Sequence, residues 1–579
     1  MSSSLPLLER IALAKARRNA SLPKEYLVNL KALGLQELLD EPIPRPTLPD
    51  DPSQEYCPSD LYPSDNVLEI PRTVLPQEDV QITELPTSQL LADLASGSLS
   101  AVRCVQAFMR RAVLAQQLVN CVTEMLTDFA LQTAKDCDEY LAREGKVKGP
   151  LHGLPVSLKD QFHVSGYPTV MGYAAFIEQK QTEHAAITEL LLRAGAVPFV
   201  HTNVPQTLMR GETDNHVFGR TLNPHNRSFT CGGSSGGEGA LIALKGSPLG
   251  AGTDIGGSVR IPAAFNGLFS FRPSMHRIPY EGSLNSMQGQ ESISSVIGPL
   301  SSDLDGCIAF VRAVLAEKPW TVDPLAVAKT FDQEAFELRK LDEKTSSDTA
   351  SQTPELLKDG SPKLCFGVMW DNGLYTPHPP ITRALKEFKA KLLAQGHEVV
   401  DWVNYESQEA ATLVARLYVA DGGEDIATVA AAGGEPLMTN VTWPKPSKVP
   451  SVYDGWQLNQ EKMRFRTAFL KHWQATIEQT GTGRPIDALV CPNAPYAACP
   501  HNYNHHIPYT NLWNLVDRPA VTFPVTRVQA ELDQAESEQE TMGLRYDAAK
   551  WNGMPVNLQL VGHRMQDEEL LGIAKLVCN

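Results

Sequence analysis

Two serine-containing, glycine-rich segments lie close together in the middle of the sequence. GGSSGG holds Ser234 and Ser235, and GTDIGGS ends at Ser258. A serine hydroxyl can attack an acyl carbon if a base takes its proton and hydrogen-bond donors stabilise the oxyanion that forms. The glycines before Ser258 let backbone N–H groups point into one small space, as an oxyanion site requires. The pattern therefore indicates nucleophilic acyl transfer.

Two of these serines also have a purely structural interpretation. Ser235 lies three residues before Glu238, which is the spacing of a capping box, so it is predicted to cap the following helix. Ser258 could likewise be the N-terminal cap of the next helical turn. Capping leaves Ser234 without a role. The residue types alone do not decide which hydroxyl is the nucleophile.

A candidate base lies upstream of both segments. Lys159 ends the apolar run LPVSLK, which is typical of a buried strand. An unperturbed lysine has a pKa of ~10.4, but burial can lower that value by ~3–5 units. We expect Lys159 to be enclosed and largely neutral at the working pH, with Asp160 on the opposite face of the strand. Activity is then expected to rise with pH as Lys159 loses its proton.

Local motifs suggest two other chemistries. Residues 233–237 also match G-x-S-x-G, the nucleophile elbow of α/β-hydrolases, with Ser235 as nucleophile. That elbow follows an apolar strand, whereas NRSFTCGG is predicted to be a polar loop. HNYNHHIPY contributes His501, His505 and His506, which could suggest a metal site, but the sequence contains no HExxH motif. These histidines are instead expected on the surface or at the rim of a pocket.

Short apolar runs alternate with helical patterns on both sides of a polar stretch. LPVSLK and AVPFVHT are typical of buried strands, and AAITELLLRAGA between them is typical of a helix. The alternation resumes after residue 362 with KLCFGVMWD, PITRALKEFKAKLLAQG, PIDALVCPN, RPAVTFPVT and MPVNLQLVG. Strand–helix alternation predicts an α/β fold around one large sheet.

The chain is predicted to divide into an N-terminal part, residues 1–82, and one main domain, residues 83–579. The N-terminal part begins with amphipathic helices over residues 5–40 and continues as a proline-rich extended arm over residues 41–65. The main domain begins with a helical region up to about residue 149. Two polar stretches within it are predicted to be surface insertions, residues 329–362 and 529–541.

Composition narrows the class of protein further. The 579 residues are 42% hydrophobic and 20% charged, as in an ordinary globular protein. A net charge of −16 and the lack of a long basic run argue against a nucleic-acid partner. No window holds 18 uncharged apolar residues, so no membrane span is predicted. Ten scattered cysteines without a C-x-x-C pair are expected to be reduced and mostly buried, which favours a cytoplasmic location.

Taken together, these motifs resemble the amidase signature family. The resemblance is carried by GGSSGGEGALIALKGSPLGAGTDIGGSVRIPAAFNG and by LPVSLKD upstream. Lys159 lies 99 residues before Ser258, and Ser234 lies 24 residues before it, both in the range that the family shows. The resemblance covers about residues 85–300 together with MPVNLQLVG near the C-terminus. The N-terminal arm is similar to that of fungal acetamidase-like and general amidases.

The resemblance implies a mixed, twisted sheet flanked by helices and a Ser-Ser-Lys triad that hydrolyses amides. Ser258 would be the nucleophile that carries the acyl group, and Lys159 would be the base. Ser234, joined to Gly233 by a cis peptide bond, would relay the proton between them. Asp254 would brace the loop of Ser258 without transferring protons.

The remaining implied residues surround the substrate. Leu208 would line the acyl site, and the backbone N–H groups of Ile255, Gly256, Gly257 and Ser258 would form the oxyanion hole. The resemblance implies a small-molecule amide as substrate and neither cofactor nor metal, and a homodimer is one candidate assembly. A non-catalytic amide-binding or amidotransferase-like subunit stays open as an alternative, and the sequence does not identify the amide.

Overall fold

The structure is a computed structural model that places most of the chain. Of the sequence-based predictions, the proline-rich arm over residues 41–65 lies outside the described residues apart from Asp65. His505, His506 and parts of both surface insertions also lie outside them. The described residues are 5–34, 65–341, 355–438, 450–504, 507–535 and 540–578.

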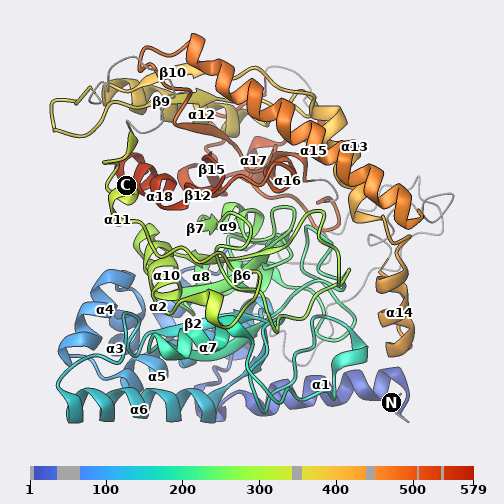
Figure 1. Ribbon diagram of the computed structural model, residues 1–579. Helices are drawn as coiled ribbons and strands as arrows, with labels where there is room; N and C mark the ends of the chain where they lie inside the picture. The colour runs from blue at the N-terminus through green and yellow to red at the C-terminus, as the bar shows by residue number, and fades with distance from the viewer. Residues whose placement is uncertain are drawn as a thin grey trace.

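An eleven-stranded mixed sheet runs through the molecule, in the order β1-β3-β2-β6-β8-β7-β12-β15-β11-β9-β10. In Figure 1 it extends from β2 in the lower part, above the helix α6, to β9 and β10 at the top. Its strands are β1 (Val122–Met125), β2 (Pro155–Lys159), β3 (Val197–Thr202), β6 (Leu249–Asp254), β7 (Phe269–Arg272), β8 (Val296–Ser301), β9 (Cys365–Val368), β10 (Glu398–Asp401), β11 (Ala488–Pro492), β12 (Ala520–Arg527) and β15 (Pro555–Val561). Two small sheets pair β4 (Leu222–Asn223) with β5 (Asn226–Thr230) and β13 (Glu540–Thr541) with β14 (Leu544–Arg545).

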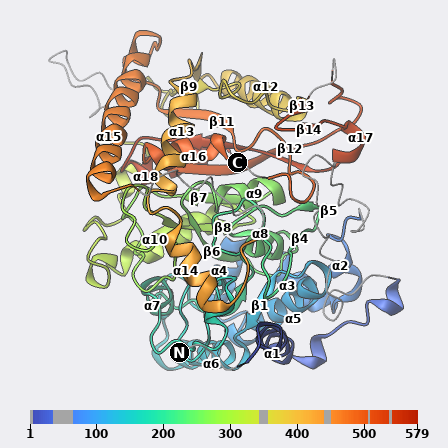
Figure 2. The ribbon, with the colours of Figure 1, turned by 90° about the vertical axis from the view of Figure 1, so that its right-hand side faces the viewer.

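Helices flank the large sheet. The longer ones are α1 (Leu7–Ser21), α4 (Thr87–Ser96), α5 (Ala101–Val119), α6 (Thr127–Glu144), α7 (Ala186–Arg193), α8 (Gly236–Ala243), α9 (Arg260–Asn266), α10 (Leu304–Ala316), α12 (Pro379–Ala394), α13 (Ser407–Tyr418), α14 (Glu424–Gly433), α15 (Val452–Gln474), α16 (Pro508–Leu515) and α18 (Asp567–Val577). Shorter ones are α2 (Ile70–Val74), α3 (Gln77–Thr83), α11 (Gln333–Phe336) and α17 (Ala548–Trp551), with a 3-10 turn, η4, at Ala174–Phe176. Figures 1 and 2 show α15 along the upper part of the molecule and α14 lower down, toward α1.

The part of the sheet that matters for chemistry is its parallel segment. β2 pairs in parallel with both β3 and β6, so the carboxyl ends of the three strands meet at one edge. β2 ends at Lys159 and β6 ends at Asp254. The helix α8 packs against β2, β3 and β6 and is buried along its first two turns. A site that draws on β2, β6 and α8 is therefore held by the interior of the fold.

The predicted α/β fold with one large sheet is confirmed, and every apolar run named as a strand contains one. Two local predictions are wrong. The region expected to be helical up to residue 149 also contains β1, because Val122–Met125 pair with β3. NRSFTCGG is not a polar loop: Asn226–Thr230 form β5, whose backbone pairs with β4 despite its polar side chains. The division at residue 82 stays a prediction.

The cysteines agree with the expectation of reduced, buried thiols. Nine cysteines lie in the described parts of the chain; all nine are free and eight of them are buried. In the same parts, no helix combines the length and the apolar character needed to cross a membrane.

Candidate active site

Lys159 and Ser234 meet at the carboxyl edge of β2. The Lys159 side chain is fully buried, and its Nζ donates to Ser234 Oγ and to Thr253 Oγ1, each at 2.7 Å. Burial lowers the pKa of Lys159 to about 7, although the carboxyl groups of Asp254 and Glu238 act in the opposite direction. The amine is thus enclosed, as expected from the apolar run before it, and can release its proton near neutral pH.

Asp160 is the first residue after β2, and its carboxyl group is directed away from the Lys159 amine, as the alternation of side chains predicts. Its Oδ1 accepts the backbone N–H of Val170 at 3.0 Å, and burial raises its pKa to about 7. Asp160 is not among the groups that act on the Lys159 amine. The Asp160 carboxyl group thus has other hydrogen-bond partners than the Lys159 amine.

Ser234 follows a cis peptide bond from Gly233, as the resemblance implies. A Cβ on Gly233 would lie 2.7 Å from the carbonyl oxygen of Arg210 and 2.9 Å from the backbone nitrogen of Glu212. The absence of a side chain at Gly233 is what lets the backbone of residues 210–212 lie against Gly233, next to Ser234 in the chain. Ser234 is 2% exposed.

Ser258 lies in the loop between β6 and α9 and is 7% exposed. Its carbonyl oxygen accepts the backbone N–H of Ser235 at 3.1 Å, which joins the two glycine-rich loops. The N-cap position of α9 is held by Val259, so the interpretation of Ser258 as a helix cap is wrong. The Ser258 hydroxyl is left without a capping role.

Ser235 does not form the predicted capping box. It occupies the N-cap position of α8, but its side chain makes no cap hydrogen bond. Its Oγ instead lies 3.4 Å from both the backbone nitrogen and the carbonyl oxygen of Thr253. The carboxyl group of Glu238 points into the interior, where it bonds Ser157 and Thr202, because α8 is buried against the sheet. Ser235 itself is fully buried.

Asp254 holds the loop that carries Ser258. Its carboxylate accepts the Gly257 N–H at 2.8 Å and two hydrogen bonds from the Arg260 guanidinium, both at 3.0 Å. A further bond comes from Asn514 Nδ2 at 2.8 Å. Burial would raise the pKa of Asp254, but Arg260 outweighs it and the pKa falls to about 2. Asp254 is a permanent anion that ties the loop to the start of α9.

Side chains from α13 and α16 hold the carbonyl groups of the same loop. The Tyr418 hydroxyl donates to the Ile255 carbonyl oxygen and the Thr510 hydroxyl to that of Gly256, each at 2.6 Å. Gly257 has a φ of +131°, and a Cβ there would lie 2.3 Å from Thr510 Oγ1. Only glycine fits this position, because the backbone conformation and the contact both exclude a side chain.

The fixed carbonyls determine where the N–H groups point, because a trans peptide directs its N–H opposite to its C=O. The Gly257 N–H is taken by Asp254, and the Gly257 carbonyl accepts the Ile261 N–H at 2.7 Å. Within the described part of the chain, the N–H groups of Gly256 and Ser258 have no hydrogen-bond partner. Of the four predicted oxyanion donors, the Gly257 N–H is thus engaged, while the N–H groups of Ile255, Gly256 and Ser258 have no partner among the described residues.

A second set of polar contacts around Lys159 was not predicted from the sequence. Thr253 Oγ1 donates to Gln161 Oε1 at 2.8 Å, and Gln161 Nε2 donates to the Tyr280 hydroxyl at 2.7 Å. Thr253 lies inside the GTDIGGS motif, so its place next to Asp254 was the available signal. No local pattern marks Gln161 or Tyr280, because their role depends on contacts between distant segments.

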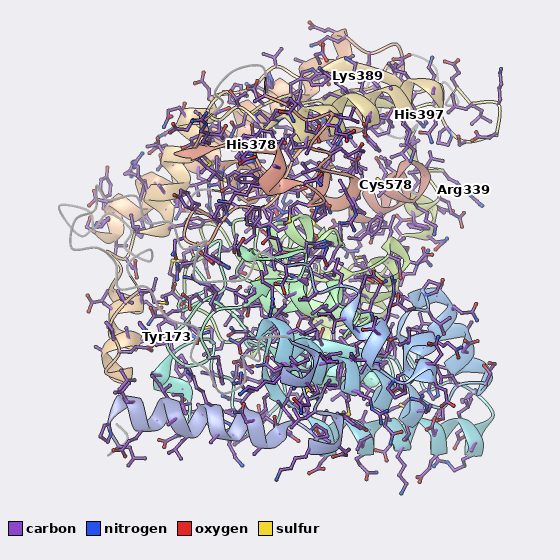
Figure 3. All side chains as sticks on the ribbon, turned by 180° about the vertical axis from the view of Figure 1, so that it is seen from behind. Tyr173, Arg339, His378, Lys389, His397 and Cys578 are labelled. Atoms are coloured by element: carbon purple, nitrogen blue, oxygen red, sulfur yellow. The ribbon has the colours of Figure 1, made fainter. Side chains whose placement is uncertain are left out.

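Leu208 packs into an apolar cluster beside the site. It is 5% exposed and lies in one buried cluster with Met171, Tyr173, Val204 and Ala430. Tyr173, labelled in Figure 3, also brings its hydroxyl to 3.1 Å from Ser286 Oγ. The cluster therefore joins the loop after β3 to α14, and Leu208 lies two residues before Arg210, which contacts Gly233.

His501 lies in the interior rather than on the surface or at a rim, so that prediction is wrong for this residue. It is fully buried, with Nδ1 2.6 Å from Glu212 Oε1 and Nε2 3.0 Å from the Arg227 carbonyl oxygen. Both ring nitrogens are engaged because the loop folds onto residues 211–212. Among the residues that the structure places, no three His, Cys, Asp or Glu side chains gather as metal ligands would.

Comparison with known proteins finds a family model and relatives that match most of the chain. The family model described as Amidase matches residues 103–571. The chain is 36% identical over 542 residues to an acetamidase of Emericella nidulans, covering 92% of this chain and 95% of that protein. It is 37% identical over 523 residues to an acetamidase of Aspergillus oryzae, covering 88% and 93%.

Solved structures show the same architecture. A fatty acid amide hydrolase superposes with a TM-score of 0.84 at 29% identity, covering 98% of this chain and 94% of that one. A bacterial aryl acylamidase has a TM-score of 0.65 at 18% identity, covering 84% and 94%. At that identity the second likeness concerns the fold alone.

Proposed function

Because the chain belongs to the amidase family and is an amidase, we propose that it hydrolyses a linear carboxylic amide through an acyl-enzyme formed on Ser258. The single observation that carries the proposal is the contact of 2.7 Å between a fully buried lysine amine, Lys159, and the hydroxyl of Ser234. A buried amine that can lose its proton near neutral pH is a suitable base for a serine nucleophile.

In the proposed acylation, Ser258 Oγ attacks the amide carbon while its proton passes to Ser234 Oγ. The proton of Ser234 passes in turn to Lys159 Nζ. The tetrahedral intermediate then collapses: the C–N bond breaks, and the leaving nitrogen takes the proton back along the same path. Ammonia or an amine leaves, and the acyl group remains on Ser258. Water repeats the sequence in the second half and releases the carboxylic acid.

The oxyanion of both tetrahedral intermediates is proposed to bind the N–H groups of Gly256 and Ser258. These two groups point away from carbonyls that Tyr418 and Ile261 hold, and neither is otherwise engaged in the described chain. Donors fixed before the reaction need no reorganisation when charge develops, and losing one typically costs 10²–10³ in rate. Asp254 acts in this scheme as the brace of the loop.

The proposed substrate is a small carboxylic amide whose acyl part contacts Leu208. The two fungal relatives are named acetamidases and the solved structure at 29% identity a fatty acid amide hydrolase, so their names point to acyl groups of different length. A series of straight-chain primary amides of increasing length, compared by kcat/KM, would define the preference. Substitution of Leu208 by alanine should shift that preference toward longer acyl groups, because it widens a closely packed apolar wall.

Fluorophosphonate labelling tests the nucleophile without a known substrate. Intact-mass measurement and peptide mapping are expected to find one adduct, on Ser258, in the wild type and none in Ser258→Ala. An adduct on Ser235 would instead support the nucleophile-elbow alternative, which the burial of Ser235 argues against. Hydrolysis of amides by the purified chain alone excludes a role as a non-catalytic or amidotransferase-like subunit.

We also propose a cytoplasmic location and a homodimer. The nine free cysteines support the first, since free thiols are typical of reducing compartments. Cell fractionation tests the location, and light scattering coupled to size-exclusion chromatography tests the assembly.

A further inference from the structure

On the face of the sheet that carries the Lys159 side chain, Gly250 of the neighbouring strand β6 leaves a space. Ser157 and Lys159 are two residues apart on β2 and share a face. Ser157 pairs with Gly250 of β6, and Lys159 pairs with Thr202 of β3. A Cβ on Gly250 would lie 1.9 Å from Glu238 Oε2. The missing side chain of Gly250 is therefore the space that the Glu238 carboxyl group occupies.

Glu238 reaches this space from α8 and is held there by two hydroxyls. Its Oε2 lies 2.5 Å from Ser157 Oγ, and its Oε1 accepts the Thr202 hydroxyl at 2.8 Å. The carboxyl group is fully buried, and no arginine or backbone N–H is bonded to it in the described chain. Burial raises its pKa to about 8, although both hydroxyls and Lys159 act to lower it.

The charged surroundings of Glu238 are few. Lys159 of β2 is the charged group that acts on its carboxyl, and the buried Cys121 thiol is a titratable group that responds to it. His201 of β3 alternates with Thr202 and lies on the other face. Asp254, at the end of β6, also acts on Lys159, but its ion pair with Arg260 lowers its pKa to about 2, so its charge does not change over the pH range in which Lys159 titrates. Lys159 and Glu238 thus form a coupled pair.

We propose that Glu238 is a positioning residue whose own protonation decides whether Lys159 can act as the base. Protonated, Glu238 leaves the Lys159 amine free to lose its proton; as a carboxylate, it holds that proton on Lys159. The inference rests on the proposed function, because it concerns the same base. In this role Glu238 is neither a helix-capping residue nor a member of the triad.

The coupling has a characteristic pH signature. One proton lost from the pair can come from either group, so the first step gives a mixture of neutral Lys159 with protonated Glu238 and of the internal ion pair. Of these two forms, only the one with neutral Lys159 can take the proton of Ser234. The fraction of protein with neutral Lys159 therefore rises in two steps, and the second step is complete when both Lys159 and Glu238 have lost their protons. The resulting curve is shallower than that of a single titrating group and extends to higher pH.

The rate of fluorophosphonate labelling at Ser258, measured from about pH 5.5 to 10.5, tests this. The wild type is expected to give the shallow two-step curve. Glu238→Gln keeps the size and cannot become an anion, so its curve should follow one proton and reach half of its own plateau at a pH lower by roughly one unit. Coincident curves for the two proteins would overturn the proposal.

Two further variants keep the test decisive. Ser157→Ala removes one hydroxyl that favours the carboxylate, so it should shift the curve in the same direction by less, and it serves if Glu238→Gln does not fold. Asp160→Asn removes a buried carboxyl of similarly raised pKa on the opposite face and should keep the wild-type shape. An Asp160→Asn curve altered like that of Glu238→Gln would overturn the proposal. A wild type that is unlabelled at every pH would instead refute the proposed function.

Discussion

Asp254 and Arg260 are joined by two hydrogen bonds of 3.0 Å, although neither side chain exposes any surface. The pair closes the loop that carries Ser258, because Asp254 is the last residue of β6 and Arg260 the first of α9. A buried ion pair of this kind is not needed for stability as such, but breaking one leaves the partner charge uncompensated.

Asp254→Asn is therefore expected to lower the free energy of unfolding by about 3–5 kcal/mol at pH 7. The lowered pKa of Asp254, about 2, means that this contribution is present above about pH 4 and is lost as the pH falls through 2. Chemical denaturation at pH 7 and pH 3 measures both. Glu461→Gln, which removes an exposed pair with Arg416, should cost at most about 1 kcal/mol. Equal losses in the two variants would contradict the structural role of Asp254.

Lys159→Met is expected to abolish hydrolysis and yet stabilise the protein. The pKa of Lys159 falls to about 7 in the native state, so between pH 7 and 10 the unfolded chain binds a proton that the native chain has released. Wild-type stability should therefore rise over that interval, and below pH 7 the native state carries the full cost of a buried charge. Methionine removes this cost, and the free energy of unfolding at pH 6 should increase by roughly 2–5 kcal/mol.

Denaturant unfolding of both proteins at pH 6, 8 and 10 checks this prediction. The difference should be largest at pH 6 and should shrink toward pH 10. A less stable Lys159→Met protein at pH 6 would mean that the amine is not desolvated as the structure indicates.

The sequence was a good guide where short-range pattern decides the structure. The run LPVSLK predicted both the strand β2 and the burial of Lys159 at its end, because an apolar segment directs its last residue into the same interior. The spacing of Ser234, Ser235 and Ser258 predicted two loops, which the backbone bond between Ser235 and Ser258 joins.

Pattern failed where partners far along the chain decide the outcome. β5 forms from polar residues because its backbone pairs with β4. Glu238 does not take part in the predicted capping box because its carboxyl group occupies the space that Gly250 leaves in the sheet. Tyr418 and Thr510, which orient the loop of Ser258, come from helices about 160 and 250 residues away. No local periodicity marks such contacts.

Thr253→Val tests the second hydrogen bond of Lys159. Valine keeps the shape of threonine but removes the Oγ1 that lies 2.7 Å from Nζ and 2.8 Å from Gln161 Oε1. We expect kcat to fall by roughly 10- to 100-fold with little change in KM, because the base loses its orientation and substrate contacts do not change. Thr253→Ser restores the hydroxyl and should recover most of the rate; failure to do so would point to packing instead.

Arg10→Ala tests the link between the N-terminal helix and the apolar cluster of Leu208. Arg10, on α1, donates to the carbonyl oxygens of Ala174 in η4 and Gly433 at the end of α14. Without it, α14 should pack less firmly, and KM is expected to rise several-fold while kcat changes less. Lys24→Ala, an exposed residue of the same N-terminal part, should leave both constants unchanged. A purely kcat effect in Arg10→Ala would argue against this link.

Gly257→Ala addresses the loop that is proposed to bind the oxyanion. Gly257 adopts a φ of +131°, and an added methyl group would meet Thr510 Oγ1 at 2.3 Å, so the loop must move. Movement displaces the N–H groups of Gly256 and Ser258 together, and the labelling rate should fall by roughly 100-fold. Gly455→Ala is the matched control, because Gly455 lies in α15 with nothing within 4 Å of the added carbon. That variant should gain about 0.5–1 kcal/mol of stability at wild-type labelling rate, and a Gly257→Ala protein labelled as fast as this control would show that the loop does not stabilise the oxyanion.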